Sequence, residues 1–336
     1  MEIVAIVGST GTGKSELALG IAHALGDCEI INADAFAQYI GMDIGTAKVM
    51  PTERQNIPHH MIDILDPMEV SSIAQYQEAA RPIISDILAR GRRPVVVGGS
   101  GLYVRALLDE MELPGSDPEI RAALEQRYQM EGLTQLFQEL QQSDPTAAAR
   151  IGPQNARRII RALEVITLTG KPYTATLPQQ EYVSPTIQIG IDYGRDSLDN
   201  RIDQRVELMR ERGLLTEVAH LTSGEKSPSL GPTAARAIGY AELLPVLAGA
   251  VEEADAFAQI ATHTKQLTRK QMTWFGRDPR VTWLDGAAPN LLDQALAVVA
   301  QGYQAPAEDN PPQLGDTPRQ RTPLGSVSAS VSGMYS

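Results

Sequence analysis

The sequence predicts an α/β fold in which a parallel sheet carries a mostly helical insertion. Three observations lead to this prediction. A glycine-rich stretch, GSTGTGKS, follows an apolar run at residues 3–7 and precedes a helical pattern. Further apolar runs at 29–32, 94–97 and 186–192 alternate with helical patterns, as in the βαβ units of a parallel sheet. Between residues 117 and 170 apolar residues recur at helical spacing instead, which indicates the insertion.

The first element is a phosphate-binding loop of the P-loop pattern, since Gly8 is followed after four residues by Gly13, Lys14 and Ser15. Its glycines let backbone N–H groups surround an anion, while the next helix N-terminus and Lys14 add positive charge. The Ser15 hydroxyl is the expected ligand of a Mg²⁺ ion. The residues expected to hold phosphate groups are Gly8, Ser9, Thr10, Gly11, Thr12, Gly13, Lys14 and Ser15.

The chain divides into three expected parts. The core spans residues 1–112 and 185–302, including helices at its C-terminal end, and the helical insertion spans 113–184. Residues 303–336 contain five prolines, many serines and few large apolar residues. Such a composition does not offset the entropy of ordering, so a disordered tail is expected there.

Composition narrows the class of protein. The chain has 336 residues and a net charge of −12, which argues against a protein that coats nucleic acid indiscriminately. Cys28 is the only cysteine, so neither an intramolecular disulfide nor a cysteine-cluster metal site can form. The N-terminus reads as a strand rather than a signal peptide, and no apolar stretch is long enough to span a bilayer. We expect a cytoplasmic monomer with no membrane partner.

A P-loop alone leaves open an NTP hydrolase, a small-molecule kinase, or a transferase that binds another diphosphate. Hydrolases usually place a Mg²⁺-binding carboxylate after a later buried strand, but here Gly98, Gly99 and Ser100 follow residues 94–97. Asp34 instead follows the run at 29–32. It is expected at the carboxyl edge of the sheet, where ligands of open α/β folds bind. Asp34 could be a metal ligand, a general base or a cap of the next element, and its place beside the P-loop favours a functional role.

Five further segments follow in order: GMDIGTAK (41–48), HHMIDILDP (59–67), GGSGLY (98–103), RRIIRALEV (157–165) and KQLTRKQMTWF (265–275). In these segments and the P-loop, the chain resembles the tRNA dimethylallyltransferases from residue 3 to about residue 284. The resemblance implies a P-loop NTPase-like core. It also implies that the substrates are tRNA and dimethylallyl diphosphate, and that the dimethylallyl group is transferred to N6 of the adenine following the anticodon. Mg²⁺ is the implied cofactor.

The resemblance implies roles for the catalytic residues Asp34, Lys14 and Ser100. Asp34 matches the residue thought to act as base on the exocyclic amine, which is a poor nucleophile without proton removal. Lys14, the loop N–H groups and Mg²⁺ would stabilise the departing diphosphate. Ser100 replaces a family threonine and keeps its hydroxyl.

Two basic stretches are implied to contact the tRNA backbone. Residues 150–171 hold five basic residues against one acidic residue, and residues 263–277 hold four basic residues and none that is acidic. The insertion is the expected clamp on the anticodon arm. Tyr103, Tyr240, Trp274 and Phe275 are candidates for stacking on a splayed base, although such aromatic residues commonly lie in a core. The implied tRNA-binding residues are Asp34, Ala35, Phe36, Ala37, Ser100, Arg121, Arg157, Arg158, Arg161, Arg236, Tyr240, Arg269 and Lys270.

Three positions depart from the family pattern. Ala35 stands in place of the usual serine, Ala241 in place of a basic residue, and Gly276 at an often basic position. These changes bear on tRNA affinity or choice more than on the chemistry. A P-loop kinase and an RNA-binding regulator without activity remain the alternatives.

Overall fold

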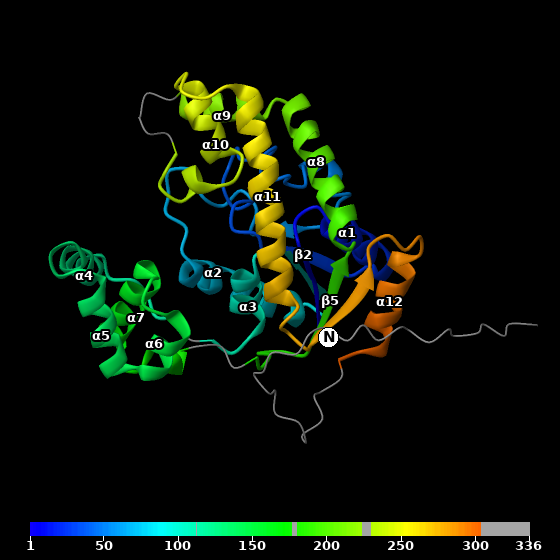
Figure 1. Cartoon of the computed structure of the whole chain (residues 1–336). Helices are drawn as coiled ribbons and strands as arrows, with labels where there is room; N and C mark the ends of the chain where they lie inside the picture. Colours follow the sequence, from blue (N-terminus) through cyan, green and yellow to red (C-terminus); the bar gives the residue numbers. More distant parts are fainter. Residues whose placement is uncertain (112, 177–179, 224–229, 304–336) are drawn as a thin grey trace, which may run out of the picture. The chain divides into compact units, whose positions relative to one another are not determined.

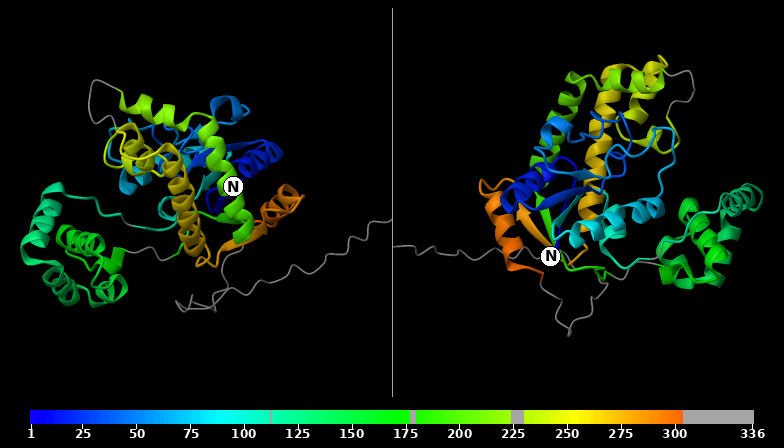
Figure 2. Two further views of the ribbon diagram at one scale, coloured as in Figure 1. Left: turned by 45° about the horizontal axis from the view of Figure 1, so that its top comes forward. Right: turned by 180° about the vertical axis from the view of Figure 1, so that it is seen from behind.

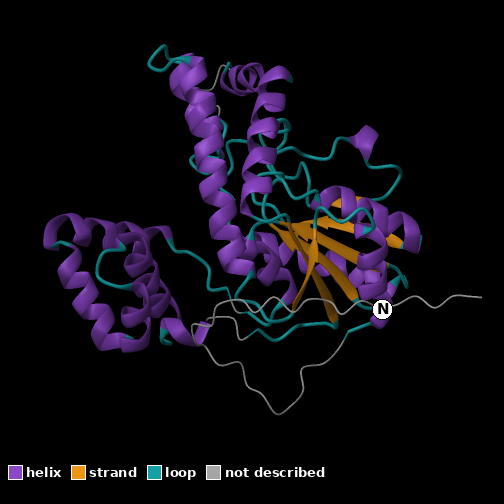
Figure 3. Ribbon diagram, turned by 45° about the vertical axis from the view of Figure 1, so that its right-hand side comes forward, coloured by secondary structure: helices purple, strands orange, loops and turns teal. Residues whose placement is uncertain are grey.

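A six-stranded sheet forms the centre of the computed structural model, which describes residues 1–111, 113–176, 180–223 and 230–303. All neighbouring strands run parallel, in the order β3-β2-β4-β1-β5-β6. Figure 3 shows the strands between helices. The strands are β1 (Ile3–Gly8), β2 (Cys28–Asn32), β3 (His59–His60), β4 (Arg93–Gly98), β5 (Thr186–Asp192) and β6 (Val281–Asp285).

The four predicted apolar runs are the central strands β1, β2, β4 and β5. Their residues are almost all buried because helices cover both faces of the sheet. The sequence analysis missed β3 and β6, the two edge strands. The short β3 pairs His59 with Ile30 of β2, and only Val281 and Leu284 of β6 are buried, so neither strand forms a continuous apolar run.

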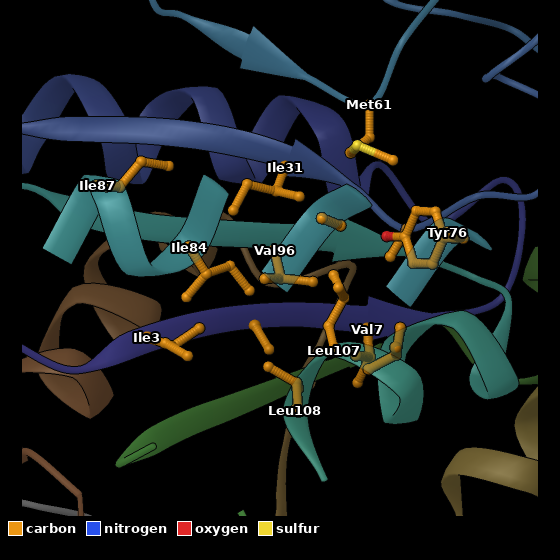
Figure 4. Packing of buried hydrophobic residues seen from close by; sticks show 14 of the residues in the cluster. Ile3, Val7, Ile31, Met61, Tyr76, Ile84, Ile87, Val96, Leu107 and Leu108 are labelled. Carbon is orange, nitrogen blue, oxygen red and sulfur yellow. The ribbon is translucent and has the colours of Figure 1, made fainter. Parts of the chain in front are cut away.

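Alternate residues of each strand point to opposite faces of the sheet, where they join two separate hydrophobic clusters. Ile3, Val7 and Val96 pack on one face against α2 and α3, as Figure 4 shows. Val4 and Ile189 pack on the other face with α1 and α12. The helices of the core are α1 (Lys14–Leu25), α2 (Ile73–Ala89), α3 (Gly101–Leu108), α8 (Arg195–Glu211), α9 (Leu214–Thr222), α10 (Tyr240–Leu247), α11 (Glu253–Phe275) and α12 (Leu291–Gln301).

A third cluster joins α8, α9, α10 and α11 to the segment after β2, through Tyr39 and Met42. The long helices α8 and α11 lie side by side (Figure 1). Short 3₁₀ turns occur at η1 (Pro51–Glu53), η2 (Tyr173–Thr176) and η3 (Ala234–Arg236).

The segment predicted to be helical contains four helices, drawn in Figure 2. These helices share their own hydrophobic cluster. Asp117, Asp144 and Asn155 accept backbone N–H bonds at the starts of three of them, which satisfies donors that a helix N-terminus leaves unpaired. The helices are α4 (Pro118–Glu131), α5 (Leu133–Ser143), α6 (Pro145–Ile151) and α7 (Ala156–Thr169).

The α/β fold class is confirmed by the parallel sheet and its helices. The division into a core and an insertion at residues 113–184 stays a prediction, because contacts group residues 1–303 as one unit. The predicted tail lies outside the described residues except for Tyr303, whose N–H donates to Glu2 Oε1 at 2.7 Å. Within the described ranges, no helix is long and apolar enough to cross a membrane.

Candidate functional site

A cavity of about 220 Å³ opens at the carboxyl edge of the sheet. The carboxyl ends of three neighbouring strands and the segments after them line it: the P-loop at the end of β1, Asp34 after β2, and Gly98 and Gly99 at the end of β4. Arg205 of α8 closes it from another side, and residues 46–49 form a further wall. This is the edge at which ligands of parallel sheets bind.

The P-loop is held by its own polar groups and by two helices of the C-terminal half. Lys14 Nζ donates to the Ser9 carbonyl at 2.6 Å. The Thr10 N–H donates to Gln271 Oε1 of α11 at 2.9 Å, and Arg201 Nε of α8 donates to the Gly11 carbonyl at 2.9 Å. Gly13 ends the loop with φ of 75°, a left-handed conformation that favours glycine. The loop is thus fixed before any ligand binds.

Three cations, Lys14, Lys48 and Arg205, line the cavity together with the carboxylate of Asp34. Asp43 and Asp63 neutralise Lys48. Burial lowers the pKa of Lys14 to about 8, an effect that Asp34 opposes and Arg205 reinforces. Burial also lowers the pKa of Arg205, again opposed by Asp34. Arg205 Nε is buried and has no hydrogen-bond partner among the described residues. A bound anion would satisfy this donor and offset the cost of burying both cations.

Asp34 is fixed by a short network at the end of β2. Its Oδ1 accepts the Phe36 N–H at 3.0 Å, and its own N–H donates to Asn32 Oδ1 at 3.1 Å. Asn32 Nδ2 donates to the Met61 carbonyl at 2.9 Å, and the Tyr76 hydroxyl donates to the Asn32 carbonyl at 2.7 Å. Asp34 Oδ2 accepts no hydrogen bond from a described residue, so it can take a proton from a ligand.

The third predicted catalytic residue, Ser100, is the N-cap of α3 and does not line the cavity. The adjoining glycines allow close packing beside it. A Cβ on Gly98 would lie 2.2 Å from the Ala33 carbonyl oxygen, and one on Gly101 would lie 2.0 Å from the Trp274 ring. The sequence GGSG therefore brings β2, α3 and α11 together around the site.

The residues present fit the expected metal ion. Ser15 lines the cavity from the first turn of α1. In the described part of the chain, no group of three or more His, Cys, Asp or Glu residues could hold a metal. Mg²⁺ commonly keeps several waters and binds through few protein ligands plus substrate phosphates. A single hydroxyl beside a phosphate-binding loop matches that chemistry.

The predicted tRNA-binding residues fall into two groups. Arg157, Arg158, Arg236 and Lys270 are exposed and form no ion pair with described residues. Arg269 is also exposed, but Asp199 of α8 neutralises it at 3.1 Å. The first four can meet a polyanion without breaking an internal pair.

The second group makes internal contacts. Arg121 and Arg161 both pair with the buried Glu164, at 2.9 and 3.1 Å. Phe275 is 2% exposed, and Tyr240 is fully buried against Gly45. The expectation that Tyr240 and Phe275 stack on a base is wrong for this conformation, because their rings have no accessible face. Trp274, at 44% exposure, keeps one.

The remaining predicted positions lie close to the site or on the surface. Ala37 lines the cavity, whereas Ala35 and Phe36 are half-buried beside it. Ala241 and Gly276, which depart from the family pattern, are exposed.

Arg205, Arg201 and Gln271 were missed by the sequence analysis. Both arginines lie among the many charged residues of α8, and Gln271 sits inside a segment recognised for its basic residues. The spacing of the two arginines was one available signal for their shared location, since Arg201 and Arg205 are four residues apart on one helix face. Only the fold shows that this face meets the P-loop.

Comparison with known proteins identifies the family. The family model described as IPP transferase matches residues 37–278. A tRNA dimethylallyltransferase of Bifidobacterium longum is 51% identical over 302 residues, which covers 89% of this chain and 90% of that protein. The chain belongs to the tRNA dimethylallyltransferase family. The resemblance drawn from the motifs is thereby confirmed, as is the enzyme class, a prenyl-group transferase.

Solved structures agree with this assignment. The tRNA isopentenylpyrophosphate transferase of Bacillus halodurans is 36% identical with a TM-score of 0.64, covering 89% of this chain and 96% of that one. A eukaryotic dimethylallyltransferase, described as acting on tRNA, is 26% identical with a TM-score of 0.77. The match covers 89% of this chain and 77% of the eukaryotic chain.

Proposed function

We propose that this chain transfers a dimethylallyl group from dimethylallyl diphosphate to N6 of the adenine following the anticodon of a tRNA. One observation carries the proposal: Lys14 and Arg205, two cations that form no ion pair with described residues, line a cavity together with the carboxylate of Asp34. The cations suit a diphosphate leaving group, and the carboxylate suits an amine that must lose a proton. Relatives named tRNA dimethylallyltransferase support the choice of substrates.

The diphosphate of the donor binds in the P-loop, where the loop N–H groups, Lys14 and Arg205 surround it. Negative charge grows on the leaving oxygen as the carbon–oxygen bond breaks, and preorganised donors stabilise it more than water would. Ser15 would hold Mg²⁺ at this site, and the ion would supply further charge neutralisation. Lys14 and Arg205 fix the diphosphate group of the donor. The first carbon of the dimethylallyl group then faces Asp34.

Asp34 acts as the general base. As the N6 nitrogen forms its bond to the first carbon of the donor, the bond from that carbon to the diphosphate oxygen breaks. The N6 proton passes to Asp34 Oδ2, and diphosphate leaves with the bonding pair. The product is N6-(dimethylallyl)adenosine. The Phe36 N–H holds the carboxylate during this step, and Asn32 holds the Asp34 backbone.

The tRNA binds through exposed cations, among them Arg157, Arg158 and Lys270. Their phosphate contacts place the anticodon arm, and the helical insertion serves as the clamp. The splayed adenine then enters from the side of Asp34. We propose that the enzyme works as a monomer in the cytoplasm.

The test is to incubate purified protein with unmodified tRNA and labelled dimethylallyl diphosphate, with and without ATP, and to identify the labelled nucleoside by mass spectrometry. Dimethylallyladenosine formed without ATP is the expected result. Consumption of ATP with no label reaching the tRNA would favour the P-loop kinase instead. Bound but unlabelled tRNA would favour the RNA-binding regulator.

A further inference from the structure

Three successive backbone N–H groups of the segment 41–49 converge on one carboxylate. Glu217 of α9 accepts the N–H groups of Asp43 at 3.0 Å, Ile44 at 2.7 Å and Gly45 at 3.2 Å. Consecutive N–H groups that curve around an anion form the kind of nest that binds phosphates in other proteins. Here the nest is filled by the protein's own side chain, from a residue more than 170 positions away in the chain.

Tyr240 completes this contact from α10. Its hydroxyl donates to Glu217 Oε1 at 2.5 Å, and its ring lies against Gly45, where a Cβ would come within 2.5 Å of ring carbon Cε2. Burial and the neighbouring Glu217 carboxylate raise the pKa of Tyr240 well above its usual value. The hydroxyl therefore stays protonated and keeps donating to Glu217. This contact explains why Tyr240 is buried rather than available to the tRNA.

The same segment continues directly into a wall of the cavity. Thr46, Ala47, Lys48 and Val49 line it. Lys48 Nζ binds both Asp43 Oδ1 and Asp63 Oδ1 at 2.6 Å, so residues 43 and 48 move together. The position of the wall thus depends on where the nest is held.

We propose that Glu217 is a positioning residue for the transfer reaction. Its carboxylate fixes the nest at residues 43–45 and, through Lys48, the wall of the donor cavity. The proposal rests on the proposed function, because it takes the cavity to be the donor site. It adds a role for α9 and α10, two helices that supply no residue to the cavity lining.

The test compares three variants. Glu217→Gln keeps the size of the side chain but exchanges a carboxylate oxygen for a donor that repels an N–H group. Tyr240→Phe keeps the ring on Gly45 and removes one donor to Glu217. Glu253→Gln is the matched control, since Glu253 of α11 forms an exposed ion pair with Arg210, outside the nest.

Hydrogen exchange without substrates is measured first, together with the KM for dimethylallyl diphosphate and the Kd for tRNA. In Glu217→Gln, amides 43–48 should exchange about tenfold faster, because the bonds that close the nest are lost. The KM for the donor should rise by about tenfold or more, because small displacements at a site are costly. The tRNA Kd should stay within about twofold of the wild-type value. Tyr240→Phe should show a smaller effect of the same kind, and Glu253→Gln none.

Unchanged exchange at 43–48 in Glu217→Gln would overturn the proposal, as would faster exchange with unchanged donor KM. If Glu217→Gln does not fold, Tyr240→Phe decides: faster exchange at 43–45 with raised KM supports the proposal, and wild-type behaviour overturns it. The exchange measurement needs no turnover. Absence of transfer by the wild-type protein would therefore refute the proposed function while the link between Glu217 and the wall is still measured.

Discussion

The lowered pKa of Lys14 makes donor binding depend on pH in a defined way. Burial lowers this pKa to about 8 in the free protein, whereas an ordinary lysine remains charged to above pH 10. A diphosphate binds only the charged form well, so donor binding takes up a proton when Lys14 is neutral. Donor affinity is therefore complete well below pH 8, is halved at about pH 8 and falls further above it.

The size of the effect follows from the titration. The reference is the KM for dimethylallyl diphosphate when Lys14 is fully charged. The KM should be about twofold this value at pH 8 and about elevenfold this value at pH 9. Above pH 9 the KM should rise about tenfold, or about 1.4 kcal/mol, for each further pH unit. The assay is steady-state transfer at saturating tRNA between pH 7 and 9.5. Lys14→Met is the control, and it should show a high KM that does not change with pH. A wild-type KM that stays flat to pH 9.5 would refute the idea that a neutralised Lys14 sits in the donor site.

Three further predictions follow from single contacts. Arg205→Gln should raise the donor KM by about 10- to 100-fold and leave the tRNA Kd unchanged, since Arg205 lines the proposed donor cavity. A weakened tRNA Kd would assign Arg205 to RNA binding instead. Replacing Arg157 and Arg158 together by Gln should weaken tRNA binding and lower the slope of log Kd against log salt by about 1 to 2. An unchanged slope would show that neither arginine contacts the tRNA backbone. Glu29, which is buried beside Arg90 with its pKa lowered to about 2, contributes about 3 kcal/mol to stability above pH 5, and about half of this should be lost by pH 3. In urea unfolding, the free energy of unfolding of Glu29→Gln should not show this loss between pH 5 and pH 3. Parallel pH profiles of this free energy for the variant and the wild-type protein would contradict the role given to Glu29.

Most of the sheet could be predicted because its central strands are buried on both faces. Continuous apolar runs leave little ambiguity, so β1, β2, β4 and β5 follow from the sequence within two residues at each end. The edge strands carry no such signal. The two histidines of β3 pair with β2 only because the segment before them folds back along the sheet.

The candidate site was predictable where one short segment carries the chemistry. The P-loop and Asp34 each follow a strand, and the parallel sheet brings them together. Arg205 could not be selected, since α8 has arginines at several positions and only packing shows which one faces the cavity. For Tyr240 the sequence was misleading. Its match to the family suggested a ring exposed to the tRNA, but packing against Gly45 buries the ring.

The most direct test of the account is a single-turnover transfer assay on Asp34→Asn. This variant keeps the shape of the side chain and can still accept the Phe36 N–H, but it cannot take the N6 proton. The account predicts that the transfer rate falls by about 100- to 10,000-fold, while the Kd for tRNA and the affinity for dimethylallyl diphosphate change by less than about threefold. Wild-type transfer by Asp34→Asn would contradict the assignment of Asp34 as the base. An equal loss of tRNA binding would show instead that Asp34 serves recognition.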